Sequence, residues 1–305
     1  MKRLVPVSGA GAMDGQKPPG GAGHPEKAEY KYPPKIALRC SFVNQAIMEN
    51  VLLEKDGYIA VVKLNREKTL NSLDMQTFED LGNVFDQVTK DRSIRVIIIT
   101  GTGKAFSSGL DLSVMETIHK MDNEEFQVWL RYTQERVYNI LEDTEKPTIA
   151  AINGHAIGGG FELALACDIR ISVPEAKFGL PEVNFGLVPD LGGAQRLTRL
   201  TNPGIAKELI FSGRLVDANE AYRLGIVNKI VEKESLIEAA KKLIDNKAPI
   251  AISLAKTMIN KAIDSDNRTG MVYAVQAQTI CIKSKDHQEA LSAYKEKRKP
   301  NYQGK

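Results

Sequence analysis

Residues 153 to 168 read NGHAIGGGFELALACD, and this stretch decides the fold. The apolar run at residues 148–152 just before it predicts a buried strand. Three glycines, Gly158 to Gly160, are followed by an Ala/Leu-rich segment that predicts a helix. Glycine lets the backbone approach a ligand closely, and the first N–H groups of a helix have no partner inside it. This strand, turn and helix therefore predict a site for an oxygen that gains negative charge.

The segments upstream predict further strands and helices. Strand-like runs at residues 51–54 and 58–64 are separated by Asp56-Gly57, a strong hairpin signal. Asp74 is placed to cap an amphipathic helix, and the apolar run at residues 96–100 predicts a buried strand ended by Gly101. A helix is expected over about residues 126–141. Strand and helix alternate with short connections, which predicts an α/β core with parallel strand pairing.

The chain divides into three expected parts. Residues 1–47 are rich in Gly, Pro, Lys and Ala without apolar periodicity, and we expect a mostly disordered N-terminal arm. Residues 48–240 form the expected core, and residues 241–305 the expected C-terminal helical region, which ends in one long helix from about residue 271 towards residue 297. These helices could cap the core or pack on another subunit. The second is favoured, because the last helix is too long for this chain alone to cover.

Composition excludes several classes of protein. The 305 residues carry a formal charge of +3, which is too even a balance for a nucleic-acid or polybasic membrane surface. No apolar run approaches membrane-spanning length, so no membrane partner is expected. The three cysteines, Cys40, Cys167 and Cys281, lie far apart and predict reduced thiols in a cytoplasmic protein. The four histidines show no ligand spacing, and no metal site is expected.

Two glutamates are candidates for proton transfer. Glu162 lies in the first turn of the predicted helix, and Glu182 follows Pro181 between apolar residues, a setting that raises a carboxyl pKa. Two carboxylates at one site commonly divide the roles of acid and base. From spacing alone, an alternative stays open in which Glu162 only complements the helix dipole and Glu182 is a surface loop residue.

A third segment follows the strand at residues 96–100. Residues 104–112 read KAFSSGLDL, and a loop with a bulky residue after a glycine could supply a second backbone N–H to the same site. On its own this signal is weak.

Taken together, the three segments resemble the crotonase (enoyl-CoA hydratase/isomerase) superfamily over about residues 50–303. Residues 65–73 (NREKTLNSL), 192–197 (GGAQRL) and 294–300 (YKEKRKP) match as well. The motifs are closest to enoyl-CoA hydratases and carnitinyl-CoA dehydratases. The resemblance implies a ββα-spiral core with a C-terminal helical oligomerisation region, a homotrimer or homohexamer, and an acyl-CoA thioester substrate in fatty-acid metabolism. It implies no cofactor beyond the coenzyme A that is part of the substrate.

The resemblance also implies residue roles. Glu162 and Glu182 would add water reversibly to a 2-enoyl-CoA to give a 3-hydroxyacyl-CoA, while the N–H groups of Leu110 and Gly159 hold the thioester oxygen. The residues expected to bind substrate or coenzyme A are Lys68, Leu70, Ser107, Gly109, Asp111, Leu112, Gly158, Pro181, Tyr294 and Lys297. Of these, Tyr294 and Lys297 often serve a neighbouring subunit in the family.

Asp190 departs from the usual hydratase pattern, in which glycine is common at this position. We include it among the catalytic candidates, because an acid here resembles dienoyl-CoA isomerases, carnitinyl-CoA dehydratases and 3-hydroxyacyl-CoA hydrolases. One alternative is therefore a double-bond isomerase that uses Glu182 and Asp190. Asp190 could instead be a helix N-cap ahead of Gly192. A non-catalytic binding member of the fold is less favoured, because both glutamates are present.

Overall fold

The computed structural model describes residues 48–305 of the chain. The expected N-terminal arm lies outside these residues. The strands are β1 (Val51–Asp56), β2 (Ile59–Leu64), β3 (Val96–Gly101), β4 (Ala105–Ser107), β5 (Thr148–Ile152), β6 (His155–Ile157), β7 (Ile169–Ser172), β8 (Lys177–Gly179), β9 (Val216–Asp217) and β10 (Lys229–Ile230).

The helices of the core are α1 (Met75–Lys90), α2 (Leu112–Ile118), α3 (Asn123–Thr133), α4 (Ile140–Asp143), α5 (Gly159–Ala166), α6 (Gly193–Leu200), α7 (Pro203–Ser212), α8 (Ala218–Arg223) and α9 (Leu236–Leu243). Short 3₁₀ turns are η1 (Glu67–Thr69), η3 (Glu182–Phe185) and η4 (Lys233–Ser235), and η2 (Gln134–Asn139) is a π-helix between α3 and α4. Three longer helices end the chain: α10 (Pro249–Ala262), α11 (Asn267–Lys283) and α12 (Lys285–Glu296).

Two sheets form the core. The larger has the order β1-β2-β3-β5-β7-β10, antiparallel between β1 and β2 and parallel elsewhere. The smaller has the order β4-β6-β8-β9 and is antiparallel only between β8 and β9. The pairs β3/β4, β5/β6 and β7/β8 each give one strand to either sheet before a helical segment follows. This repetition is a ββα spiral, and the predicted fold class is confirmed.

Local signals explain most of the early elements. Gly57 takes φ +57° in the turn between β1 and β2, as the predicted hairpin requires. The Asp74 side chain accepts a hydrogen bond from the Thr77 N–H and caps α1, which buries Phe78 and Leu81 against the sheet.

Two helix predictions need correction. The segment expected as one helix at residues 126–141 is helical but contains the π-turns of η2. The long final helix is wrong, because Ser284 takes an extended conformation and separates α11 from α12. Its hydroxyl accepts from the His287 N–H, so Ser284 caps a new helix rather than continuing the old one. The boundary expected between residues 240 and 241 falls inside α9, which contacts β5 and β7; the division into an arm, a core and a helical region stays a prediction.

The C-terminal helices meet the core through a buried lysine on α10. The Lys256 ammonium lies 2.9 Å from Asp168 Oδ2 and donates to the carbonyls of Leu141 at 2.8 Å and Lys146 at 3.0 Å. Because Asp168 lies two residues beyond the last residue of α5, α10 is attached near the end of that helix. Within residues 48–305, no helix combines the length and apolar character that a membrane crossing requires.

Candidate active site

The glycine turn begins where β6 ends at Ile157. Gly158 takes φ +52° and ψ −131°, a conformation that only glycine adopts readily, and its N–H donates to the Gly179 carbonyl at 2.9 Å. Gly159 then starts α5. Its N–H has no hydrogen-bond partner among residues 48–305, as expected for the first residue of a helix. The Gly159 N–H is therefore a free donor at the positive end of the α5 dipole.

Leu110 supplies a second free N–H. The Leu73 N–H donates to the Gly109 carbonyl at 2.8 Å, and the Asp111 N–H donates to the Leu73 carbonyl at 3.0 Å. This parallel bridge uses the groups on either side of Leu110, and its own N–H makes no hydrogen bond within the described part of the chain. A Cβ on Gly109 would lie 3.5 Å from the Gly159 nitrogen. The two predicted oxyanion donors therefore sit on neighbouring segments.

Glu162 lies one turn into α5 and is almost fully buried. Its Oε1 accepts hydrogen bonds from two backbone amides, Leu191 N–H at 2.9 Å and Gly193 N–H at 2.8 Å. Burial raises the pKa of Glu162 to about 8, and the charge of Glu182 adds to this, while the two amides oppose it. The predicted first-turn position is confirmed, and the side chain does more than complement a dipole.

Glu182 starts η3 directly after Pro181 and reaches the glycine turn. Its Oε1 would lie 3.2 Å from a Cβ on Gly158. Both carboxyl oxygens are buried and accept no hydrogen bond from residues 48–305. Burial raises the pKa of Glu182 to about 7, and the charge of Asp190 adds to this. A buried carboxyl group with open bonding capacity suits contact with water or substrate, so the surface-loop alternative does not describe Glu182.

Asp190 is the third acid of the cluster. It is half-buried, burial raises the pKa of its carboxyl group, and its charge raises the pKa values of both Glu162 and Glu182. The N-cap alternative is wrong, because Gly192 occupies the cap position of α6 and no side chain bonds to that cap. Asp190 therefore belongs to the acid site by position.

The predicted coenzyme A segment lies beside the second oxyanion donor. Lys68 and Leu70 are exposed and line a cavity of about 730 Å³ together with Arg66 and Lys104. The Leu70 carbonyl accepts from the Ser108 N–H at 3.0 Å, which joins the cavity wall to the loop that carries Leu110. Lys68 and Lys104 are cationic side chains that suit a ligand with phosphate groups, whereas Arg66 is already paired with Asp74 and Asp111, each at 3.0 Å.

The other predicted binding residues of this loop have clear local roles. Ser107 is buried, and its hydroxyl accepts from the Gly109 N–H at 3.2 Å. Asp111 caps α2, and hydrogen bonds from Ser72 and Ser113 hold the pKa of its carboxyl group well below the usual range. Leu112 is 79 % exposed and available for contact.

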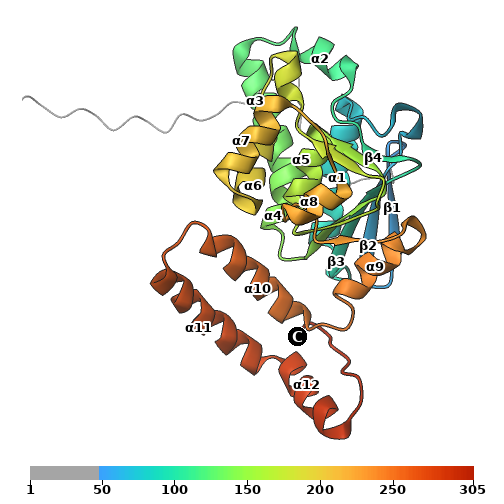
Figure 1. Ribbon diagram of the computed structural model, residues 1–305. Coiled ribbons are helices and arrows are strands. Elements are labelled where there is room, and N and C mark those ends of the chain that lie inside the picture. The colour runs from blue at the N-terminus through green and yellow to red at the C-terminus, as the bar shows by residue number, and fades with distance from the viewer. Residues whose placement is uncertain (1–47) are drawn as a thin grey trace, which may run out of the picture. The chain divides into compact units, whose positions relative to one another are not determined.

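Tyr294 and Lys297 do not join the acid site of the same subunit. Both lie at the end of α12, and Tyr294 is 85 % exposed. Figure 1 places α12 at the opposite end of this part of the chain from α2, the helix that follows Leu110. Their predicted contact with coenzyme A therefore requires a neighbouring subunit and stays a prediction.

Three features of the site escaped the sequence analysis. The Leu191 and Gly193 amides bind Glu162, and the buried Tyr138 hydroxyl donates to the Gly159 carbonyl at 3.1 Å. The glycine pair at residues 192–193 was the available signal for the first two, because glycine permits the approach of Glu162 to the backbone. Tyr138 had no comparable signal, since the π-helix that positions it was not predicted.

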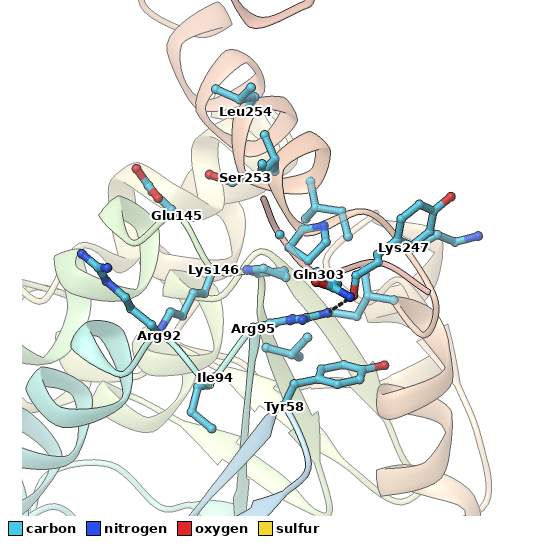
Figure 2. A pocket seen from close by; sticks show the side chains of 18 of the residues that line it. Tyr58, Arg92, Ile94, Arg95, Glu145, Lys146, Lys247, Ser253, Leu254 and Gln303 are labelled. Atoms are coloured by element: carbon cyan, nitrogen blue, oxygen red, sulfur yellow. Dashed lines mark hydrogen bonds between the residues drawn. The ribbon is translucent and has the colours of Figure 1, made fainter. Parts of the chain in front are cut away.

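A second, larger cavity lies elsewhere. It has a volume of about 1020 Å³ and lies between the core and the C-terminal helices, where Arg95, Lys146 and Lys247 contribute cationic side chains (Figure 2). Arg95 donates to the Tyr302 carbonyl at 2.8 Å and lies over the Tyr58 ring. None of the predicted site residues lines this cavity.

Comparisons with known proteins agree with the fold and the motifs. The profile of the enoyl-CoA hydratase/isomerase family matches residues 54–305. The chain is 41 % identical to a short-chain-enoyl-CoA hydratase from Clostridium acetobutylicum, over 83 % of this chain and 97 % of the relative. It is 39 % identical to a crotonyl-CoA hydratase from Syntrophomonas wolfei, over 83 % and 98 %.

A solved structure is similar over the same region. The enoyl-CoA hydratase from Bacillus anthracis superposes with a TM-score of 0.77 at 40 % identity, covering 84 % of this chain and all of that one. A family profile that spans most of the chain, and relatives at this identity over nearly their whole length, leave one assignment. The chain belongs to the enoyl-CoA hydratase/isomerase family.

Proposed function

We propose that the protein is an enoyl-CoA hydratase, which adds water reversibly to a 2-enoyl-CoA thioester and forms a 3-hydroxyacyl-CoA. The observation that carries this proposal is the convergence of two buried carboxyl groups, Glu162 and Glu182, on the glycine turn. The names of the relatives from Clostridium acetobutylicum and Syntrophomonas wolfei support it.

The oxyanion site polarises the substrate. In our proposal, the N–H groups of Leu110 and Gly159 donate to the thioester oxygen, which gains charge as water attacks carbon 3. A donor of this kind contributes about 3 kcal/mol to transition-state stabilisation in comparable sites. Neither N–H group donates a hydrogen bond to any of residues 48–305, and this supports the role.

The two glutamates then handle the protons. The oxygen of one water molecule bonds to carbon 3 while Glu162 takes up a proton of that water. Glu182 delivers a proton to carbon 2, so the double bond is replaced by one C–O and one C–H bond. Burial raises the pKa of Glu162 to about 8 and that of Glu182 to about 7, so both groups exchange protons near neutral pH. In our proposal, water adds from the state in which Glu182 carries the proton and Glu162 is ionised.

Glutamine variants test the proposal. Hydration of a short 2-enoyl-CoA, followed by loss of its ultraviolet absorbance, is expected to fall about 10³-fold in kcat for Glu162→Gln and for Glu182→Gln. Glu175→Gln, at an exposed loop position, is the matched control and keeps wild-type activity. Retention of a tenth or more of the activity by either site variant contradicts the proposed roles.

Asp190 favours a second candidate function, the shift of a double bond by Glu182 and Asp190. The half-buried Asp190 carboxyl group and its effect on the pKa of Glu182 support this alternative. A reaction in heavy-oxygen water separates the two, because hydration puts solvent oxygen into the product and isomerisation does not. Product without heavy oxygen would favour the isomerase.

We also propose that the protein assembles as a homotrimer or homohexamer and acts in the cytoplasm. Apolar side chains on the C-terminal helices support assembly: Ile259 on α10 is 66 % exposed, and Met271 and Val275 on α11 are each 69 % exposed. Apolar surface of this kind is typical of subunit interfaces. The same assembly would bring Tyr294 and Lys297 of one copy to the coenzyme A of another.

A further inference from the structure

The hydrogen bonds to Glu162 continue beyond the two amides that make them. The Leu191 N–H belongs to the peptide unit whose carbonyl is that of Asp190. That carbonyl accepts from the Gln134 side-chain amide at 2.6 Å. A chain therefore runs from Gln134 Nε2 through one peptide unit to Glu162 Oε1.

The second amide has a similar chain, but it is made by backbone alone. The Gly193 N–H belongs to the peptide unit with the Gly192 carbonyl, which accepts from the Arg196 N–H at 3.0 Å in the first turn of α6. That bond is part of the helix. Gln134 is thus the one side chain that donates to a carbonyl of these two peptide units among residues 48–305.

The π-helix explains why Gln134 reaches this loop. Gln134 opens η2, and Tyr138 lies four residues later in the same wide turns. Gln134 donates to Asp190, and Tyr138 donates to Gly159. The two side chains therefore support the two halves of the site, the loop that binds Glu162 and the turn that carries an oxyanion donor. π-Turns inside α-helices are frequent at functional sites.

We propose that Gln134 is a positioning residue for Glu162, which fixes and polarises the Asp190–Leu191 peptide so that its N–H stabilises the ionised carboxylate. This inference rests on the proposed function for its effect on turnover. Hydrogen bonds in a chain strengthen one another, by about 10–30 % per bond. A Glu162 carboxylate that is stabilised in this way is available as the base.

The groups around Glu162 determine in which direction its pKa moves when the hydrogen bond from Leu191 weakens. Glu182 on η3 and Asp190 in the loop before α6 both place negative charge near Glu162. Tyr138 on η2 faces Glu162 as a neutral phenol. Arg196 on α6 is occupied by Glu142 at 3.0 Å and by the Leu191 carbonyl at 3.0 Å. The amides therefore oppose two repelling carboxylates. Weaker donation from Leu191 raises the pKa of Glu162.

Gln134→Met tests the inference, since methionine has a similar length and no donor. The pKa of Glu162, measured by carboxyl infrared or NMR titration with the Glu162→Gln difference as assignment, is expected to rise by about 0.5, from the 10–30 % strengthening of a charge-assisted bond. We expect kcat for hydration to fall about tenfold with KM within twofold, because a misplaced base slows the chemical step. Gln127→Met, at an exposed position on α3, is the matched control and leaves both unchanged.

The outcomes separate this inference from the proposed function. An unchanged Glu162 titration in Gln134→Met overturns the positioning role, even where kcat falls. Gln134→Glu gives a second reading, because an ionised carboxylate cannot donate and is expected to shift the titration further in the same direction. A wild-type protein that hydrates no enoyl-CoA overturns the proposed function, while the titration of Glu162 still decides the role of Gln134.

Discussion

Glu162 experiences two opposing influences. Removal from water and the negative charges of Glu182 and Asp190 favour its protonated form, and the amides of Leu191 and Gly193 favour the ionised form. Burial is the larger influence, so the pKa is raised to about 8. A carboxyl group in this state exchanges protons near neutral pH, which ordinary glutamates do not.

The pH dependence of hydration follows from the pair. With pKa values of about 7 for Glu182 and about 8 for Glu162, both are protonated at low pH and no base is present. At high pH both are ionised and no acid is present. We expect kcat/KM to be bell-shaped with its maximum between about pH 7 and pH 8, since the limbs report the two proton losses of the pair. A rate that stays level from pH 5 to pH 10 would contradict this.

Glu162 also lowers stability at alkaline pH. Its pKa is about 8 in the folded protein against 4.5 for an unperturbed glutamate, so the folded state binds more protons in that window. Stability is therefore lost as pH rises from about 4.5 to about 8. Glu162→Gln is expected to gain about 2 kcal/mol in the free energy of unfolding at pH 8 and nothing at pH 4. Denaturant titration at both pH values checks this, and an equal effect at each pH would count against it.

At the scale of elements, the site depends on the close approach of α5 to β4. A Cβ on Gly160 would lie 2.5 Å from the Ser107 Cβ and 2.8 Å from the Ser107 carbonyl oxygen, closer than real contacts allow. Because the backbone of β4 cannot move without a large energetic cost, the absence of a side chain at Gly160 determines how closely α5 approaches β4. The two oxyanion donors are Gly159, at the start of α5, and Leu110, in the loop after β4. Their separation therefore depends on how closely α5 approaches β4.

Gly160→Ala and Gly270→Ala form a matched pair, since both glycines are helical. Gly160→Ala is expected to cost about 2 kcal/mol of stability by overpacking and to reduce kcat. Gly270 lies in α11, where the nearest atom to a Cβ is 3.9 Å away, so Gly270→Ala is expected to gain about 0.8 kcal/mol from helix propensity. Unfolding in denaturant measures both, and similar effects at the two positions would refute the packing argument.

The sequence predicts elements with local signals and misses those that depend on distant residues. The apolar strand β3 and the Asp74 cap were both predicted, because a few adjacent residues determine them. Ser284 was a local signal too, but the continuing apolar pattern around it favoured one helix. Glu162 and Glu182 could be named from motifs. The Gln134 bond to Asp190 spans 56 residues, and no spacing rule predicts such a contact.

At the scale of the whole molecule, the apolar faces of α10 and α11 predict association of copies. Ile259→Glu with Val275→Glu places charges at exposed apolar positions and is expected to shift the protein towards monomer in analytical ultracentrifugation. Gln87→Glu, at an exposed position on α1, is the control and leaves the mass unchanged. A wild-type protein that sediments as a monomer at micromolar concentration would contradict the proposed assembly.

In the proposed assembly, the Lys256–Asp168 ion pair would connect the association of copies to catalysis. Helix α5 carries the Gly159 donor and Glu162 in its first turn, and Asp168, which holds the α10 lysine, lies two residues beyond its last residue. In the proposed assembly, an adjoining copy that packs on α10 would act on this contact at one end of the eight-residue helix α5, and the proposed catalytic groups lie at the other end. Turnover per polypeptide is consequently expected to decline on dilution, in the same concentration range in which the assembly comes apart.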